Sequence, residues 1–112
     1  MTYATPYLHQ TVTVKVDRQL GTNHPKHGFV YCLNYGYIPE TTAPDGEEID
    51  AYILGVFKPI EEFEWEVIAV IHRTNDDDDK LVVVPTWTIY TDDQIRALTE
   101  FQERFFESEI IK

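Results

Sequence analysis

The 112-residue sequence is poor in cysteine, in positive charge and in long apolar runs. Cys32 is its single cysteine, so no disulfide can form within the chain. No apolar run approaches the roughly 20 residues that span a bilayer. The first ten residues also lack the basic and then apolar layout of a secretory signal. We therefore expect a cytoplasmic protein with no membrane partner.

Positive charge is scarce because 9 Lys and Arg residues oppose 20 Asp and Glu residues, which gives a net charge of −11. Such a surface repels the phosphate backbone of nucleic acid, so we expect no nucleic-acid partner. An acidic protein can still handle a small phosphorylated molecule when divalent cations lie between the two sets of negative charge. The length and the 43% hydrophobic content match one globular domain, expected over residues 1–112.

Short segments with strand-like patterns recur along most of the chain. The clearest is TVTVKVD, in which valines alternate with polar residues at the period of two of a half-buried strand. The expected strands are residues 11–17, 29–35, 49–55, 64–72 and 80–90. Pro85 interrupts the last of them because it cannot donate to a strand ladder. The spacing, with turns and no helices between, favours an antiparallel barrel or sandwich over a parallel sheet.

One helix is expected near residues 92–108. Thr91 and Gln94 have the spacing of a capping box at its start. Apolar residues follow at helical spacing, and we expect them to cover one mouth or flank of the barrel. These residues are Ile95, Leu98, Phe101 and Phe105.

Two acidic stretches stand at the ends of expected strands. PDGEEID, residues 44–50, contains Asp45, Glu47 and Asp50, and NDDDDK, residues 75–80, ends in Lys80. Each stretch alone is explained by a solvated turn. The second is not an EF-hand loop, since the required glycine and glutamate are absent from its sixth and twelfth positions. Together on one rim of a barrel, the two stretches would form a multi-metal site.

The segment YCLNYGYIPETTAPDGEEIDAYILG, residues 31–55, resembles the signature region of the family I soluble inorganic pyrophosphatases. That family joins an Asn-Tyr-Gly-Tyr-Ile segment to an Asp-x-Asp-x-x-Asp box, and Tyr35 to Asp45 keeps the family's ten-residue interval. DDDDKLVVVP is similar to the family's next metal-binding loop, and FQERFFESE resembles its closing helix. The resemblance implies a mainly β protein, with a five-stranded, partly closed, antiparallel OB-like barrel and a C-terminal α-helix. It also implies a homo-oligomer.

The resemblance further implies a metal-dependent inorganic diphosphatase. Pyrophosphate must have its charge neutralised before a hydroxide approaches, and Mg²⁺ or Mn²⁺ bound by carboxylates would do so. The implied metal ligands are Asp45, Glu47, Asp50 and Asp78. Glu47 also matches the acid that activates the attacking water.

Other residues are assigned to catalysis and to phosphate binding. Tyr35 and Lys80 join Glu47 in the implied catalytic set. The expected substrate-binding residues are Lys15, Arg18, Tyr31 and Lys26. Aromatic packing explains each tyrosine about as well as a site does. His72 and Arg73 are expected to pair with Asp76 or Asp77 rather than to contact substrate.

The sequence departs from the family pattern at three points. Glu47 is one methylene longer than the family's aspartate, and a displacement of about 1 Å can cost roughly a hundredfold in rate. A Tyr-Lys pair that follows Phe-Phe-Glu in the family is absent here. The loop between Lys15 and Tyr31 is shorter, so the segment NHPKHG, residues 23–28, is a candidate for the missing phosphate contacts or simply an exposed polar loop.

Three functions remain open from the sequence. The first is a compact inorganic pyrophosphatase. The second is a phosphohydrolase acting on a larger phosphoanhydride such as a nucleotide, because the missing Tyr-Lys pair would open one end of the site. The third is a non-catalytic barrel that binds metal and phosphate.

Overall fold

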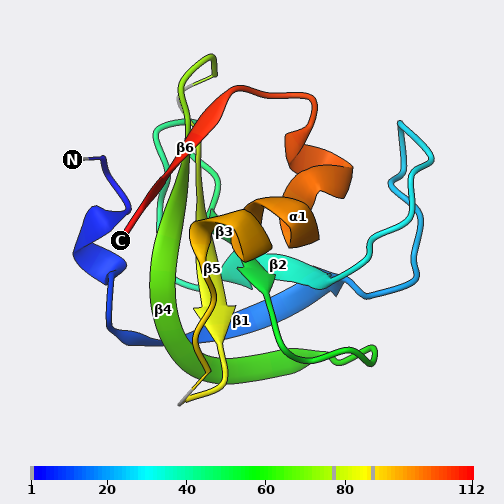
Figure 1. The fold of residues 1–112 in the computed structure, drawn as a ribbon, viewed down its shortest axis with the longest axis horizontal. Coiled ribbons are helices and arrows are strands. Elements are labelled where there is room, and N and C mark those ends of the chain that lie inside the picture. The colour runs from blue at the N-terminus through cyan, green and yellow to red at the C-terminus, as the bar shows by residue number, and fades with distance from the viewer. Residues whose placement is uncertain (1, 77, 87) are drawn as a thin grey trace.

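The computed structural model describes residues 2–76, 78–86 and 88–112. Its elements in chain order are a 3-10 helix η1 (Thr5–Tyr7), β1 (Thr11–Arg18), β2 (Asn34–Ile38), β3 (Ile49–Ile53), β4 (Glu62–Arg73), β5 (Asp79–Val84), α1 (Asp92–Glu103) and β6 (Ser108–Ile111). Figure 1 shows the long strand β4 curving along one side of the molecule, with α1 in front of the sheet.

Five strands form a closed barrel. They are hydrogen-bonded in the order β1-β2-β3-β5-β4, and a further pairing of β1 with β4 closes the circle. β6 adds to β4 outside this circle. The expected five-stranded barrel with a C-terminal helix is confirmed. It is not wholly antiparallel, however, because β5 turns back from β4 and lies beside β3, with which it runs parallel.

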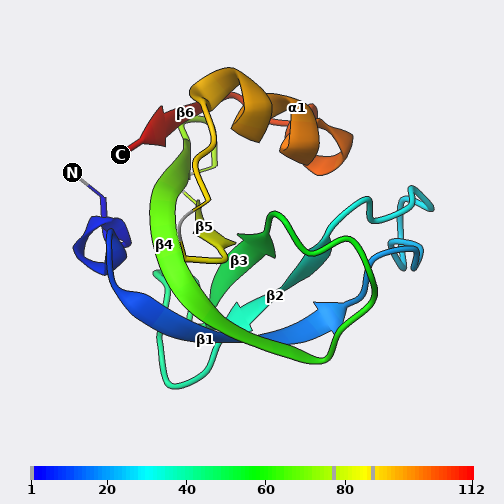
Figure 2. The same cartoon turned by 60° about the horizontal axis from the view of Figure 1, so that its bottom comes forward.

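Apolar clusters pack against both faces of the barrel wall. The barrel interior holds an apolar cluster drawn from all five strands, including Val14, Ala51, Val67 and Leu81. A second cluster lies outside the barrel, where Ile95 of α1 packs over β3, β4 and β5. All six residues of β5 are consequently buried. Figure 2 shows α1 lying across one side of the barrel in this way.

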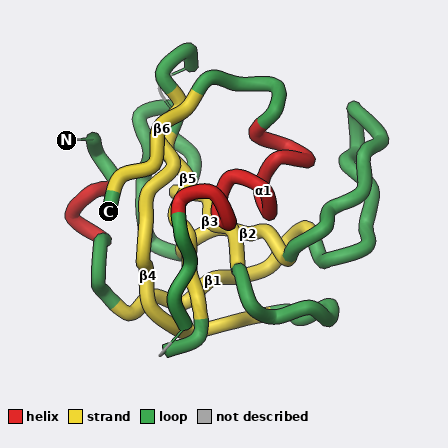
Figure 3. Tube along the Cα trace, viewed as in Figure 1, coloured by secondary structure: helices red, strands yellow, loops and turns green. Residues whose placement is uncertain are grey.

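Several expected elements have different bounds in the structure. The strand expected at 29–35 begins only at Asn34, because residues 29–33 belong to the long β1–β2 loop, drawn green in Figure 3. β5 ends at Val84, directly before Pro85. The helix ends at Glu103 rather than near 108, because the chain turns and pairs with β4 as β6. Trp87, inside the last expected strand, lies outside the described residues.

The start of α1 follows the sequence closely. The Thr91 hydroxyl accepts from the backbone N–H of Gln94, and the Gln94 side chain accepts from the N–H of Thr91, so the expected capping box is present. Of the residues expected to cover the barrel, Ile95 is buried, while Phe105 lies beyond the helix and is 54% exposed. No helix among the described residues is long and apolar enough to cross a membrane.

Candidate active site

The candidate site lies on the outer surface of the barrel, beside the C-terminal end of α1. Residues paired directly across neighbouring strands point to the same face of a sheet. The pairings Tyr37↔Asp50 and Asp50↔Lys80 therefore place Asp50 and Lys80 on one face. Tyr35 pairs with Tyr52, two positions further along each strand, so both rings share that face.

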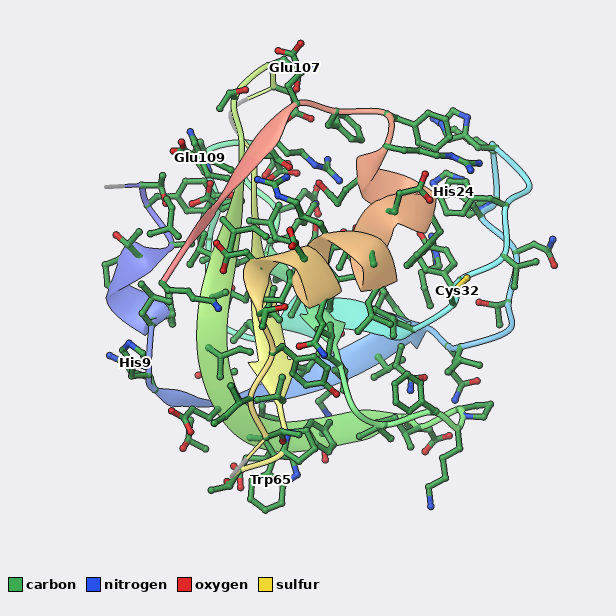
Figure 4. The ribbon with its side chains drawn as sticks, in the orientation of Figure 1. His9, His24, Cys32, Trp65, Glu107 and Glu109 are labelled. Atoms are coloured by element: carbon green, nitrogen blue, oxygen red, sulfur yellow. The ribbon has the colours of Figure 1, made fainter. Side chains whose placement is uncertain are left out.

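A cavity of about 450 Å³ opens on this face. Its lining combines cations, acids and aromatic rings: Asp17, Arg18, His24, His27, Phe29, Tyr31, Tyr35, Asp50, Arg73, Lys80, Gln102, Phe105 and Phe106. The residues come from strands β1 to β5, from the β1–β2 loop and from the end of α1. The β1–β2 loop approaches the segment that follows α1 through the rings of His27 and Phe105, whose centroids are 6.1 Å apart. Figure 4 shows His24 on this loop, close to the end of α1.

Lys80 joins the two acidic stretches. Its ammonium donates to Oδ2 of Asp50 at 2.6 Å and to Oδ2 of Asp78 at 2.8 Å. Burial alone would lower the pKa of Lys80, but the two carboxylates outweigh it and hold that pKa above its ordinary value. Burial would likewise raise the pKa of Asp78, and Lys80 and the Tyr3 hydroxyl hold it below its ordinary value. Both groups are therefore charged at neutral pH.

Arg73 forms the other buried ion pair of the cavity wall. Its Nε donates to Oε1 of Glu103 at 3.0 Å and its Nη2 to Oε2 at 2.7 Å. Both side chains are almost fully buried. The guanidinium carbon also lies 3.6 Å from the ring centroid of Phe106. Burial opposes the charge, but Glu103 more than compensates and raises the pKa of Arg73.

A chain of hydrogen bonds ends on the Glu103 carboxylate of this ion pair. Tyr31 donates its hydroxyl to Oε1 of Gln102 at 2.9 Å. Nε2 of Gln102 donates to the hydroxyl of Tyr52 at 2.7 Å, and that hydroxyl donates to Oε2 of Glu103 at 2.6 Å. Gln102 and Tyr52 thus link Tyr31, at one side of the cavity, to the carboxylate that holds Arg73.

The four expected metal ligands do not converge in one pocket. Asp50 and Asp78 meet at Lys80, whereas Asp45 lines a separate hollow of about 380 Å³ together with Asp76 and Asp78. Glu47 is exposed on the β2–β3 loop and lines neither hollow. Across residues 2–76, 78–86 and 88–112, no three His, Cys, Asp or Glu side chains are grouped so as to hold a metal ion. Asp78 connects the two hollows. It lines the second hollow with Asp45, and it pairs with Lys80, which lines the main cavity.

The expected substrate-binding residues separate into two sets. Arg18 and Tyr31 line the main cavity. Lys15 is half exposed. It lies on β1 between Tyr37 of β2 and Glu62 of β4, and its ammonium pairs with Glu62 at 3.0 Å. Lys26 is exposed and is not among the residues that line the cavity, whereas its loop neighbours His24 and His27 are. The pairings Lys15↔Tyr37 and Tyr37↔Asp50 place Lys15 on the same face of the sheet as Asp50, but Lys15 is not among the residues that line the cavity.

The tyrosines lie in the cavity wall but not as neighbours on one strand. Tyr35 belongs to β2, while Tyr31 lies in the preceding loop, and their ring centroids are 5.6 Å apart. Burial, and then the charge of Asp50, raise the pKa of Tyr35 well above its ordinary value. Tyr35 therefore keeps its proton at neutral pH and can act only as a hydrogen-bonding group or packing surface.

Two features of the site were not expected from the sequence. Arg73 does pair with Asp76, at 3.4 Å, but it also lines the cavity. The N-terminal segment holds the acidic loop: Tyr3 donates its hydroxyl to Oδ1 of Asp78 at 3.1 Å and accepts from the N–H of Asp79 at 2.9 Å. His72 pairs with Asp79 at 2.7 Å rather than with Asp76, and Asp77 lies outside the described residues.

The sequence model of the family described as inorganic pyrophosphatase matches residues 5–110. A curated inorganic pyrophosphatase of Saccharolobus solfataricus is 37% identical over 76 residues, which are 64% of this chain and 41% of that relative. The chain thus matches less than half the length of this curated relative.

Solved structures of inorganic pyrophosphatases share the fold. The structure from Ehrlichia chaffeensis has a TM-score of 0.72 at 18% identity, covering 94% of this chain and 86% of its own. The structure from Helicobacter pylori has a TM-score of 0.71 at 15% identity, covering 91% and 84%. Because the family model spans nearly the whole sequence and the barrel agrees with it, the chain belongs to the inorganic pyrophosphatase family.

Proposed function

We propose that this protein is an inorganic pyrophosphatase that hydrolyses diphosphate to two phosphates with the help of divalent metal ions. The observation that carries the proposal is the meeting of Asp50 and Asp78 at the ammonium of Lys80, on the wall of a cavity that also holds two arginines. Family membership supports this function over the nucleotide phosphohydrolase and over the non-catalytic barrel.

The donor set fits a hard cation in its chemistry. Asp50 and Asp78 offer only oxygen ligands, which Mg²⁺ prefers, and they already converge on one positive charge. We assign them to metal binding together with Asp45, which shares a hollow with Asp78, and with Glu47 on the same loop as Asp45. Mg²⁺ is the proposed ion, with Mn²⁺ as the alternative. When bound, such an ion neutralises phosphate oxygens and acidifies a water.

The other residues would bind and orient the substrate. Lys80 and Arg18 bring positive charge to the cavity, where a diphosphate would otherwise meet the acids. Protonated Tyr35 offers a hydroxyl as a hydrogen-bond donor. Glu47 is proposed to accept the proton of the attacking water.

The proposed function is tested by phosphate release. The wild type is assayed with pyrophosphate and with a nucleoside triphosphate, side by side, in Mg²⁺ and in Mn²⁺. Asp78→Asn is assayed in parallel, with Glu109→Gln on β6 as a variant of equal charge change away from the cavity. Release from pyrophosphate alone, lost in Asp78→Asn and kept in Glu109→Gln, is expected. Faster release from the nucleotide, or none from either substrate, would contradict the proposal.

A homo-oligomer in the cytoplasm is proposed as the working form. Large apolar side chains are exposed outside the cavity, among them Phe57 at 63% and Trp65 at 40%. Figure 4 shows Trp65 projecting at the lower edge of the molecule, away from His24. Contact between copies would bury such side chains. Sedimentation of the wild type and of Trp65→Ser tests this, and a wild-type monomer at micromolar concentration would contradict it.

A further inference from the structure

The guanidinium of Arg73 has donor capacity that its ion pair does not use. An arginine carries five N–H donors. Glu103 takes one from Nε and one from Nη2 at short distances. Nη1 has only long contacts, at 3.4 Å to Oδ2 of Asp76 and 3.7 Å to Oδ2 of Asp78. One edge of the group is therefore held, while the other is weakly engaged.

Arg73 lies on the face of the sheet that carries the main cavity, next to Lys80. Arg73 lies two positions after Ile71 on β4, and Ile71 pairs directly with Lys80, so Arg73 and Lys80 occupy one face of the sheet. Both line the main cavity. The Phe106 ring lies over the guanidinium and limits its movement. Such a held, planar cation suits an oxyanion better than a mobile lysine does.

We propose that Arg73 is a phosphate-binding residue of this cavity, with Glu103 as the positioning residue that holds it. The proposal rests on the proposed function for the identity of the anion, an inorganic diphosphate. Phosphate oxygens would replace the long contacts of Nη1 to Asp76 and Asp78. Arg73 thereby supplies a phosphate contact in a chain that lacks the family's C-terminal Tyr-Lys pair.

A purely structural role for the Arg73–Glu103 pair is the competing explanation. Removing Arg73 alone would leave Glu103 buried without a counter-charge and would endanger folding. The double variant Arg73→Gln/Glu103→Gln removes both charges and keeps a polar side chain at each position. Arg73→Lys keeps the charge and loses the planar fork. Arg96→Gln, on the exposed side of α1, changes the net charge as much as a loss of Arg73 would.

The experiment measures binding of methylenediphosphonate, a diphosphate analogue whose bridge cannot be hydrolysed, by calorimetry with Mg²⁺ present. Thermal unfolding of every variant is recorded alongside. Arg73→Gln/Glu103→Gln is expected to raise Kd about tenfold or more, which is the size of a charge-assisted hydrogen bond. Arg73→Lys is expected to fall between this variant and the wild type, and Arg96→Gln to match the wild type.

The outcomes separate this inference from the proposed function. A folded double variant that binds the analogue as tightly as the wild type would overturn the role of Arg73, even if pyrophosphate is hydrolysed. Binding that depends on Arg73 in a protein that hydrolyses no pyrophosphate would support the anion site and overturn the proposed activity. A wild type that binds no analogue at millimolar concentration would overturn the inference as well. A double variant that does not fold moves the decision to Arg73→Lys, where unchanged Kd would overturn the role.

Discussion

The ammonium of Lys80 lies 2.6 Å from a carboxylate oxygen of Asp50 and 2.8 Å from one of Asp78. The two acids come from different acidic stretches of the sequence, 28 positions apart, which β3 and β5 bring side by side in parallel. A buried lysine thus balances the charges in the absence of metal. Metal and lysine then act on the same pair of carboxylates, and this has consequences that can be measured.

Replacing Lys80 should make the protein less stable but more responsive to metal. Lys80→Gln leaves Asp50 and Asp78 without their shared cation, and we expect a loss of about 1–3 kcal/mol in the free energy of unfolding without metal. Mg²⁺ should restore part of this loss by binding the folded state. The measurement is melting temperature against Mg²⁺ concentration. A smaller metal-induced shift in Lys80→Gln than in the wild type would contradict the shared role of the two acids.

Asp50→Asn tests the other side of the same pair. The substitution keeps the shape but removes a charge that a cation needs, so a higher Mg²⁺ concentration should be required for activity and for thermal stabilisation. Glu109→Gln, at the exposed residue of β6, is the matched control. An acid on a solvated turn can be exchanged within about 0.5 kcal/mol. Superimposable Mg²⁺ titration curves for all three proteins would therefore rule out Asp50 as a metal ligand.

Glu47→Asp tests the residue that departs from the family pattern. If Glu47 accepts the proton of the attacking water, the shorter side chain should maintain or raise metal-dependent hydrolysis of pyrophosphate. Glu47→Gln, which cannot accept that proton, should lower kcat by about a hundredfold or more. The two variants are compared at saturating Mg²⁺. Equal kcat in both would remove Glu47 from the proposed mechanism.

The raised pKa of Tyr31 predicts how the free energy of unfolding changes at high pH. Burial raises the pKa of Tyr31 above its ordinary value of 10.0, with Arg18 opposing the shift. The folded state therefore favours the protonated hydroxyl, and its contribution to stability is fully present below pH 10 and is lost as the pH rises through the folded pKa. Urea unfolding of the wild type and Tyr31→Phe should show a difference in free energy that shrinks above pH 10. A difference that stays constant up to pH 11 would contradict this.

The sequence alone determined the type and order of most elements. Alternating valines in residues 11–17 produced β1, and Thr91 with Gln94 produced the start of α1, because both signals are local. The interval between Tyr35 and Asp45 and the run before Lys80 indicated the family for the same reason. Residues close in sequence carry these patterns whatever the rest of the chain does.

Tertiary pairing decided where those elements ended and what they faced. α1 stops at Glu103 because the following segment gains a partner in β4 as β6, which helical periodicity cannot report. Lys15 shares a face with Asp50 through Tyr37, but the pairing of β1 with β4 brings Glu62 within 3.0 Å of its ammonium. Long-range strand register fixes such contacts, and a one-residue change in register would reverse the face of every side chain.

The same reason explains why Arg73 was assigned only to its sequence neighbours. Asp76 lies three residues away and is visible as a partner in the sequence, and the structure does pair the two. Glu103 lies 30 residues away and becomes the main partner only when α1 packs over the barrel. The acidic and aromatic residues of the candidate site can thus be identified from the sequence. Which cation is held among them is decided by the packing of α1 and β4, because a buried charge can remain only where a distant counter-charge meets it.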